Sequence, residues 1–136
     1  MYNSSGYERV ETLRMLDGLV DIYLPDCKYV DSSLSLALSG AENYFKMASA
    51  AILEMARQTG ITQFDADGMM TKGTMVRHLV LPGHTKNSMQ VLDWLSTIKD
   101  HVWVSLMFQY TPCGDVSAHK ELQRCLTKRE CEKVWQ

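Results

Sequence analysis

Long apolar runs and an excess of charge of one sign are both missing from this 136-residue chain. No apolar run approaches the ~18 residues of a membrane span, and the first residues are not the charged and then apolar segment of a signal peptide. Basic and acidic residues nearly balance, at 14 and 16. This balance gives no reason to expect nucleic acid or an anionic membrane as partner. We therefore expect a cytoplasmic protein that binds neither.

The sequence also lacks the spacings of a metal site. It has four cysteines and four histidines, but no C-x-x-C pair and no zinc-type histidine spacing. An even number of cysteines would allow two disulfides, yet the composition is not that of a small secreted domain. We expect reduced thiols without a structural role for Cys27, Cys113, Cys125 and Cys131, and no metal site in this chain.

Helix and strand patterns alternate along the chain. Helices are expected over residues 8–17, from a capping box at Ser39–Glu42 to Gly60, and from a Thr85 cap to Ile98; strands are expected over residues 19–24, 74–81 and 101–108. Strands separated by helices of this length indicate an α/β fold with a parallel sheet. Residues 1–116 would form this unit, and the charged residues 117–136 would be a tail, either a helix or an extended arm. Three parallel strands leave open edges and an uncovered face, so we expect something else to complete the sheet.

Charged side chains occur at two of the expected strands: two follow the first strand, at the strand end where ligands of parallel sheets bind, and one lies within the second. Asp26 and Lys28 share a face with the apolar residues of the first strand because side chains alternate along a strand. They are either a surface ion pair or a site for a zwitterionic ligand. Arg77 lies within the second strand and requires a carboxylate or phosphate partner, unless it reaches around an edge strand.

Four segments together resemble one family. In order, they are Asn3–Glu8, Val20–Tyr29 with its Asp-x-Lys motif, Val76–His84 with Arg-x-Leu-Val-Leu-Pro-Gly, and Ser105–Pro112. Their order and content are similar to those of radical S-adenosylmethionine (SAM) proteins, and most of all to homologues of pyruvate formate-lyase-activating enzyme. The resemblance covers nearly the whole chain.

The resemblance implies a parallel-stranded partial (β/α) barrel, of which this chain would be about the C-terminal half of a TIM-like (β/α)6 barrel. In such enzymes a [4Fe–4S] cluster binds SAM and cleaves it reductively to a 5′-deoxyadenosyl radical. That radical takes hydrogen from a substrate, which in the activases is a glycine of a partner glycyl-radical enzyme.

The resemblance also assigns cofactor-binding positions. Asp26 and Lys28 would lie beside the methionine part of SAM, and Arg77 would reach toward the same region from the next strand. Asn3 and Ser4 would replace the Asp-Thr pair with which activases help to hold a cation. The remaining two positions, Gln109 and Tyr110, would lie near the adenosine.

Several family features are absent. The cluster motif C-x-x-x-C-x-x-C, the glycine-rich Gly-Gly-Glu segment and a histidine at position 111 are all missing. We therefore expect an inactive fragment of an enzyme, which binds SAM in the millimolar range or not at all. One alternative is a stand-alone interaction module that pairs its sheet edges with itself, as a homodimer, or with another chain. A third hypothesis is a small unrelated enzyme that uses Asp26 and Lys28 as acid and base.

Overall fold

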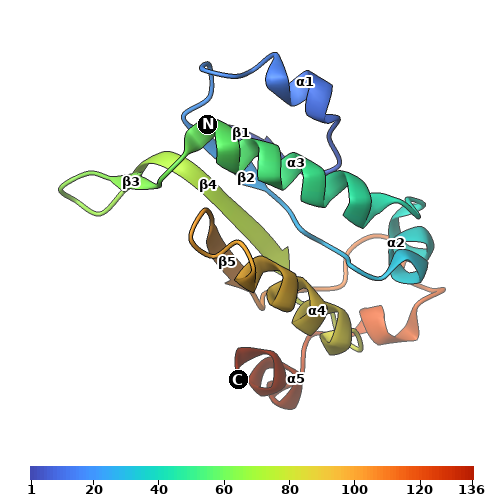
Figure 1. Ribbon diagram of the computed structural model, residues 1–136. Helices are drawn as coiled ribbons and strands as arrows, with labels where there is room; N and C mark the ends of the chain where they lie inside the picture. The colour runs from blue at the N-terminus through green and yellow to red at the C-terminus, as the bar shows by residue number, and fades with distance from the viewer.

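The protein is an open five-stranded sheet with helices along the chain between most of its strands (Figure 1). A computed structural model describes all residues, 1–136. Its elements in chain order are β1 (Tyr2–Ser4), α1 (Val10–Arg14), β2 (Ile22–Pro25), α2 (Ser32–Ser39), α3 (Tyr44–Thr59), β3 (Gln63–Phe64), β4 (Met70–Leu79), α4 (Thr85–Ser96), β5 (Trp103–Met107), the 3-10 helix η1 (Lys120–Gln123) and α5 (Lys128–Trp135).

Strand β4 is the centre of the sheet. It pairs in parallel with β2 and β5, and β2 pairs in parallel with β1. The short β3 is the exception, because it runs antiparallel to β4 and extends with its turn away from the rest of the molecule (Figure 1). The parallel α/β arrangement predicted from the sequence is therefore confirmed. The sheet is open, since β1 and β5 each have one free edge.

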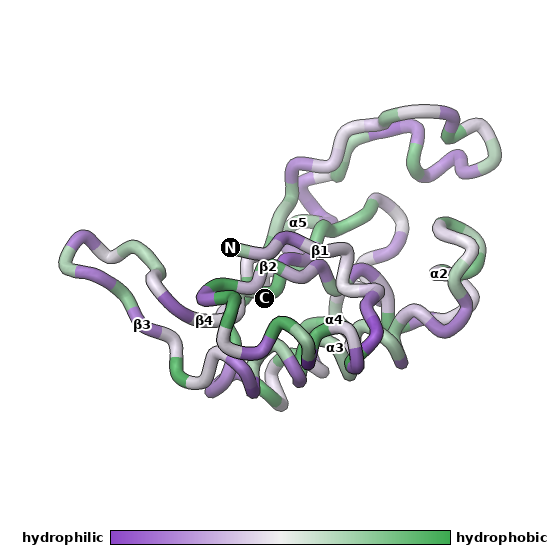
Figure 2. Tube along the Cα trace, turned by 90° about the horizontal axis from the view of Figure 1, so that it is seen from above, coloured by the Kyte–Doolittle hydropathy of each residue, from purple (hydrophilic) through white to green (hydrophobic).

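One face of the sheet carries the core. Helices α3 and α4 lie together on one side of the strands (Figure 2), where Ile52, Val91 and Leu95 pack with Val76 of β4. Burial of these apolar side chains is the main stabilising contribution to such a layered fold. On β4 the side chains alternate, so that Val76 and His78 are buried under the helices while Arg77 and Leu79 lie on the other face and are only half-buried. No helix covers that other face.

The connection between β2 and α3 differs from the prediction. Residues 32–39 form helix α2, because the Asp31 carboxylate accepts hydrogen bonds from the Ser33 and Leu34 amides and so caps it. Ser39 is consequently the last residue of α2, and the predicted capping box at this position is wrong. Gly40 ends the helix in the left-handed conformation, and α3 begins only at Tyr44.

The two ends of the chain were predicted only in part. Residues 2–4 form the edge strand β1, although the sequence predicts no element before residue 8. Between the two ends, at the start of α4, the predicted Thr85 cap is wrong. His84 precedes the first turn, and neither the His84 nor the Thr85 side chain caps the helix. In the tail, η1 is followed by α5, which Thr127 and Glu130 cap reciprocally and which packs on α4. The longest helix, α3, has 16 residues, and no helix combines the length and apolarity of a membrane span.

Candidate functional site at the carboxyl ends of β2 and β4

A pocket of about 380 Å³ lies on the uncovered face of the sheet. Its lining comes from the ends of β2, β4 and β5, and consists of Asp26, Lys28, Tyr29, Arg77, Leu79, Leu81 and Met107. Asp26 and Lys28 therefore share one face, as strand alternation predicted, and Arg77 of the neighbouring strand lies on it with them. The pocket combines an apolar floor with three charged side chains, which is the usual make-up of a small-molecule site.

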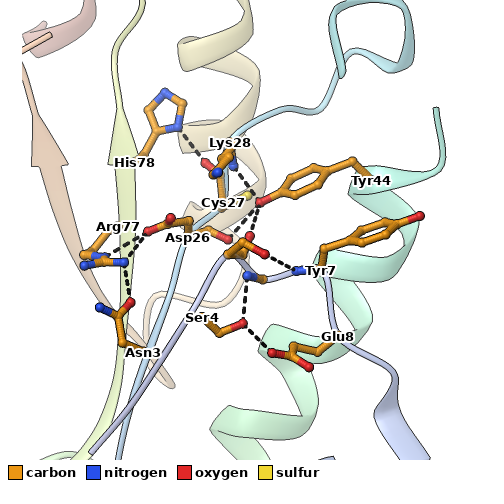
Figure 3. A network of polar contacts seen from close by, with 12 residues as sticks. Asn3, Ser4, Tyr7, Glu8, Asp26, Cys27, Lys28, Tyr44, Arg77 and His78 are labelled. Atoms are coloured by element: carbon orange, nitrogen blue, oxygen red, sulfur yellow. Dashed lines mark hydrogen bonds and ion pairs between the residues drawn. The ribbon is translucent and has the colours of Figure 1, made fainter. Parts of the chain in front are cut away.

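The Arg77 side chain joins three strands. Its Nη2 lies 2.7 Å from Oδ1 of Asp26, its Nε donates to the same oxygen at 2.9 Å, and its Nη2 also donates to Oδ1 of Asn3 at 2.6 Å (Figure 3). The arginine and aspartate side chains are only 27% and 24% exposed, so water screens the pair weakly. Arg77 therefore has the carboxylate partner that the sequence predicts, and it does not reach around an edge.

Of the two alternatives for Asp26 and Lys28, the ion pair between them does not form. Side chains two apart on one strand are about 7 Å apart, whereas those on neighbouring strands are about 5 Å apart. Asp26 accordingly pairs with Arg77 across the β2–β4 bridge, where the Cys27 amide also donates to the Arg77 carbonyl at 2.9 Å. The exposed Lys28 ammonium has no hydrogen bond or ion pair in the structure.

The backbone of Lys28 is held firmly although its ammonium is free. Its amide donates to the Tyr44 hydroxyl at 3.1 Å, and its carbonyl accepts a 3.0 Å hydrogen bond from Nδ2 of Asn87 in α4. Oδ1 of the buried Asn87 accepts from the Val30 amide at 2.9 Å. Asn87 thus positions the loop after β2, a role that sequence reasoning missed because its partners are more than fifty residues away in the chain.

The Tyr44 hydroxyl also fastens the loop after β1 to the end of β2. It donates to the Ser5 carbonyl oxygen at 2.7 Å and lies 3.0 Å from that of Asp26. Burial raises the pKa of Tyr44 well above its usual value, so the hydroxyl keeps its proton. Gly6 makes the close approach of the two loops feasible, because at its φ of +80° a Cβ would overlap the Asp26 carbonyl oxygen.

Behind the pocket, His78 connects β4 to β2 and α4. Its Nδ1 lies 2.7 Å from the Cys27 carbonyl oxygen, which can only accept, so Nδ1 carries the proton. Burial lowers the pKa of His78, and the neutral ring accepts at Nε2 from the Ser88 hydroxyl at 2.8 Å. Burial likewise raises the pKa of the Cys27 thiol to about 12. Both groups are fixed parts of the scaffold on the helix side of the sheet.

Three of the predicted site residues lie elsewhere. Ser4 faces away from the pocket, since its hydroxyl donates to Glu8 at 2.8 Å and accepts from the Gly6 amide at 3.0 Å. Gln109 is exposed beyond β5, and the Tyr110 hydroxyl donates to the Leu122 carbonyl at 2.8 Å. The structure therefore brings together Asn3, Asp26, Lys28 and Arg77 but not these three, while Tyr29 and Met107 join the pocket without having been predicted there.

The cysteines do not form a metal centre. No group of three or more histidine, cysteine, aspartate or glutamate side chains could hold a metal ion. Cys27 is buried on the helix side, Cys113 and Cys125 are exposed, and Cys131 is half-buried in α5. An iron–sulfur cluster therefore has no ligand set in these residues. The pocket does offer groups of both signs, a free ammonium and an arginine-paired carboxylate, which are the partners that a zwitterionic ligand needs.

The comparisons with known proteins identify one relative and no family. The chain is 30% identical over 135 residues to the uncharacterized protein MJ0674 of Methanocaldococcus jannaschii. The alignment covers 98% of this chain but 36% of that protein, so the chain spans about a third of its relative's length. No protein-family model and no solved structure matches the chain.

Proposed function

We propose that this chain is the part of a radical SAM enzyme, similar to the activating enzyme of pyruvate formate-lyase, that surrounds the methionine end of the cofactor. One observation carries the proposal: a free lysine ammonium and an arginine-held carboxylate share a pocket at the carboxyl ends of β2 and β4. The methionine end of SAM carries an ammonium and a carboxylate, so it needs partners of both signs. The uncovered face of the sheet would be the inner surface of half a (β/α)6 barrel.

Each pocket residue has a distinct task in this proposal. Lys28 binds the ligand carboxylate, because its ammonium has no partner within the chain. Asp26 accepts from the ligand ammonium through an oxygen lone pair that Arg77 leaves free, and Arg77 fixes the orientation of this carboxylate. Leu79, Leu81 and Met107 contact the methylene groups and exclude water. SAM supplies the radical chemistry, and this chain supplies the binding.

The reductive cleavage of SAM and the formation of a glycyl radical on a partner enzyme belong to the proposed whole enzyme. The cysteines of these 136 residues do not fit a [4Fe–4S] cluster, so this chain alone is inactive in the proposal. The relative of which it spans 36% has room for cluster ligands outside the aligned part. The sequence encoded upstream of residue 1 provides a direct check, since the proposal requires a C-x-x-x-C-x-x-C motif there.

Titration of the isotope-labelled chain with SAM, followed by amide chemical shifts, tests the binding. We expect a Kd of about 1–10 mM, which corresponds to only about 3–4 kcal/mol, because half of the surrounding surface is missing. The shifts should be largest at Lys28, Leu79 and Met107. Lys28→Met should abolish them, while Lys99→Met, an exposed lysine beyond α4, should not. Micromolar affinity, or millimolar shifts that Lys28→Met leaves unchanged, would contradict the proposal.

A stand-alone interaction module is the second candidate, and the free edge of β5 favours it. This strand carries no charge to discourage pairing, and Trp103 and Val104 are 52% and 39% exposed. The module would form a dimer through two β5 edges. Light scattering after size-exclusion chromatography should then give twice the chain mass, and Val104→Lys should restore the monomer. A monomeric wild-type protein would exclude this candidate.

A further inference from the structure

A second pocket shares Lys28 with the first. Its volume is about 320 Å³, and it is lined by Ser5, Tyr7, Lys28, Ser39, Gly40, Ala41 and Tyr44. These residues come from the loops after β1 and β2, the end of α2 and the start of α3. Except for Lys28, none of them lines the pocket on the open face of the sheet.

The aromatic side of this second pocket is rigid. The rings of Tyr7 and Tyr44 stack at a centroid distance of 6.0 Å and an interplanar angle of 9° (Figure 3). Tyr44 is almost fully buried and meets Tyr29 edge-on, while the Tyr7 hydroxyl donates to Oδ1 of Asn43 at 2.5 Å. Tyr7 is therefore held at both its ring and its hydroxyl.

Tyr7 nevertheless remains 44% exposed. A fixed aromatic ring with an open face can stack on another ring without losing side-chain entropy, since that loss has already occurred on folding. Stacking of this kind recognises any planar π-system and contributes about 1–3 kcal/mol per ring in nucleic-acid complexes. Tyr7 thus lines the second pocket with one ring face held against Tyr44 and with enough of its surface exposed to contact a planar group.

The rest of the pocket adds charge and polarity. The Lys28 ammonium has no partner in the chain, and Ser5 and Ser39 also line the space, with their hydroxyls bonded to the Tyr7 amide and to the Tyr29 hydroxyl. Neither an aspartate nor a glutamate lines the pocket, so its net charge is positive. A cation beside an aromatic face favours a ligand that carries a negative group on a planar ring.

We propose that this pocket binds a planar heteroaromatic ring bearing a carboxylate or phosphate, with the ring stacked on Tyr7 and the anion on Lys28. The proposal goes beyond the cofactor-binding role. It uses the same Lys28 ammonium, so the two ligands would compete for it, but it places the ring against Tyr7 and the α2–α3 turn, which take no part in the first pocket. It adds a second binding site to the same end of the sheet.

Three matched small probes separate the two contributions. Nicotinate has a ring and a carboxylate, nicotinamide has the ring without the charge, and acetate has the charge without the ring. Amide shifts of the labelled chain should show nicotinate binding at Tyr7, Gly40 and Ala41, with nicotinamide and acetate each about fivefold or more weaker. Signals of Leu79 and Met107 report the first pocket separately, so failure of one proposal is distinguishable from failure of the other.

Variants complete the test. Tyr7→Leu keeps an apolar side chain but removes the ring, and Lys28→Met keeps the stem but removes the charge; each should weaken nicotinate binding about fivefold or more. Phe64→Leu is the control, because Phe64 is exposed to 43%, nearly as much as Tyr7, but lies in β3. Unchanged nicotinate affinity in Tyr7→Leu, equal affinity for all three probes, or shifts confined to Leu79 and Met107 would each overturn the proposal.

Discussion

Replacement of Gly6 by alanine tests how tightly the loops after β1 and β2 are packed. Gly6 has a φ of +80°, where an alanine costs about 1–2 kcal/mol in backbone strain alone. Its new methyl group would also overlap the Asp26 carbonyl oxygen and come within 3.3 Å of the Tyr44 hydroxyl. The backbone of Asp26 must then move, and the hydrogen bonds of Tyr44 to Ser5 and Asp26 must lengthen.

The expected loss follows from these contacts. Overpacking against a backbone atom costs about 1–3 kcal/mol, and each weakened hydrogen bond costs about 1 kcal/mol. Together with the backbone strain, Gly6→Ala should therefore lower the free energy of unfolding by about 4–7 kcal/mol. Urea denaturation followed by circular dichroism measures this difference. Because domains of this size have only about 5–15 kcal/mol in total, the transition should move to a much lower urea concentration.

Gly18 provides the matched control. It has the same φ of +80°, but no atom lies within 4 Å of the position where a Cβ would be. Gly18→Ala should therefore cost only the strain of about 1–2 kcal/mol. Equal losses in the two variants would refute the close packing of Gly6 on Asp26, since strain alone would then account for both.

Three further predictions concern the same region. In a double-mutant cycle of unfolding free energies with Asp26→Leu and Arg77→Met, the two side chains should show a coupling energy of about 1–3 kcal/mol. The exposed pair Lys128–Glu132 is the control and should show no measurable coupling. Absence of coupling between Asp26 and Arg77 would contradict the geometry. Burial places the pKa of His78 below its usual 6.5, so in acid the unfolded chain binds a proton that the folded chain does not. As the pH is lowered from about 7.5 to 5.5, the free energy of unfolding of the wild type should fall. In His78→Asn the fall over the same range should be smaller by up to about 1.4 kcal/mol. The same pH dependence in both proteins would show that His78 titrates normally. With a thiol reagent at mildly alkaline pH, the exposed Cys113 and Cys125 should react at once. Cys27 should react only on unfolding, because it is buried and its pKa is about 12. Fast labelling of all thiols would contradict the burial of Cys27.

Period-two patterning accounts for what the sequence could reveal of the site. The strand ending at Pro25 and the apolar run around Arg77 indicated both strands and the shared face of Asp26 and Lys28. The place of Arg77 beside them was implied only by the family resemblance. The alternation within each segment could not predict which strands pair or in which register. The choice of Arg77 over Lys28 as the partner of Asp26 depends on the β2–β4 register, which has no signature within either segment.

The other differences between the predicted and the observed structure arise in short, polar elements. Strand β1 consists of Tyr-Asn-Ser, which is too short and polar to show a strand pattern, and it forms by pairing its backbone with β2. Helix α2 lies in a serine-rich segment that resembles a loop, and its one clear signal is the Asp31 cap. The role of Asn87 depends on partners brought close only by the fold.

The hydrogen bond from Arg77 to Asn3 joins residues 74 positions apart, and that from Arg77 to Asp26 joins residues 51 apart. Each requires a crossover connection to have closed, and closure of long loops is what slows the folding of parallel sheets. The polar cluster therefore cannot form locally, before the sheet. A probe at Asn3, such as a fluorine-labelled residue beside it, would report the completion of folding rather than its start.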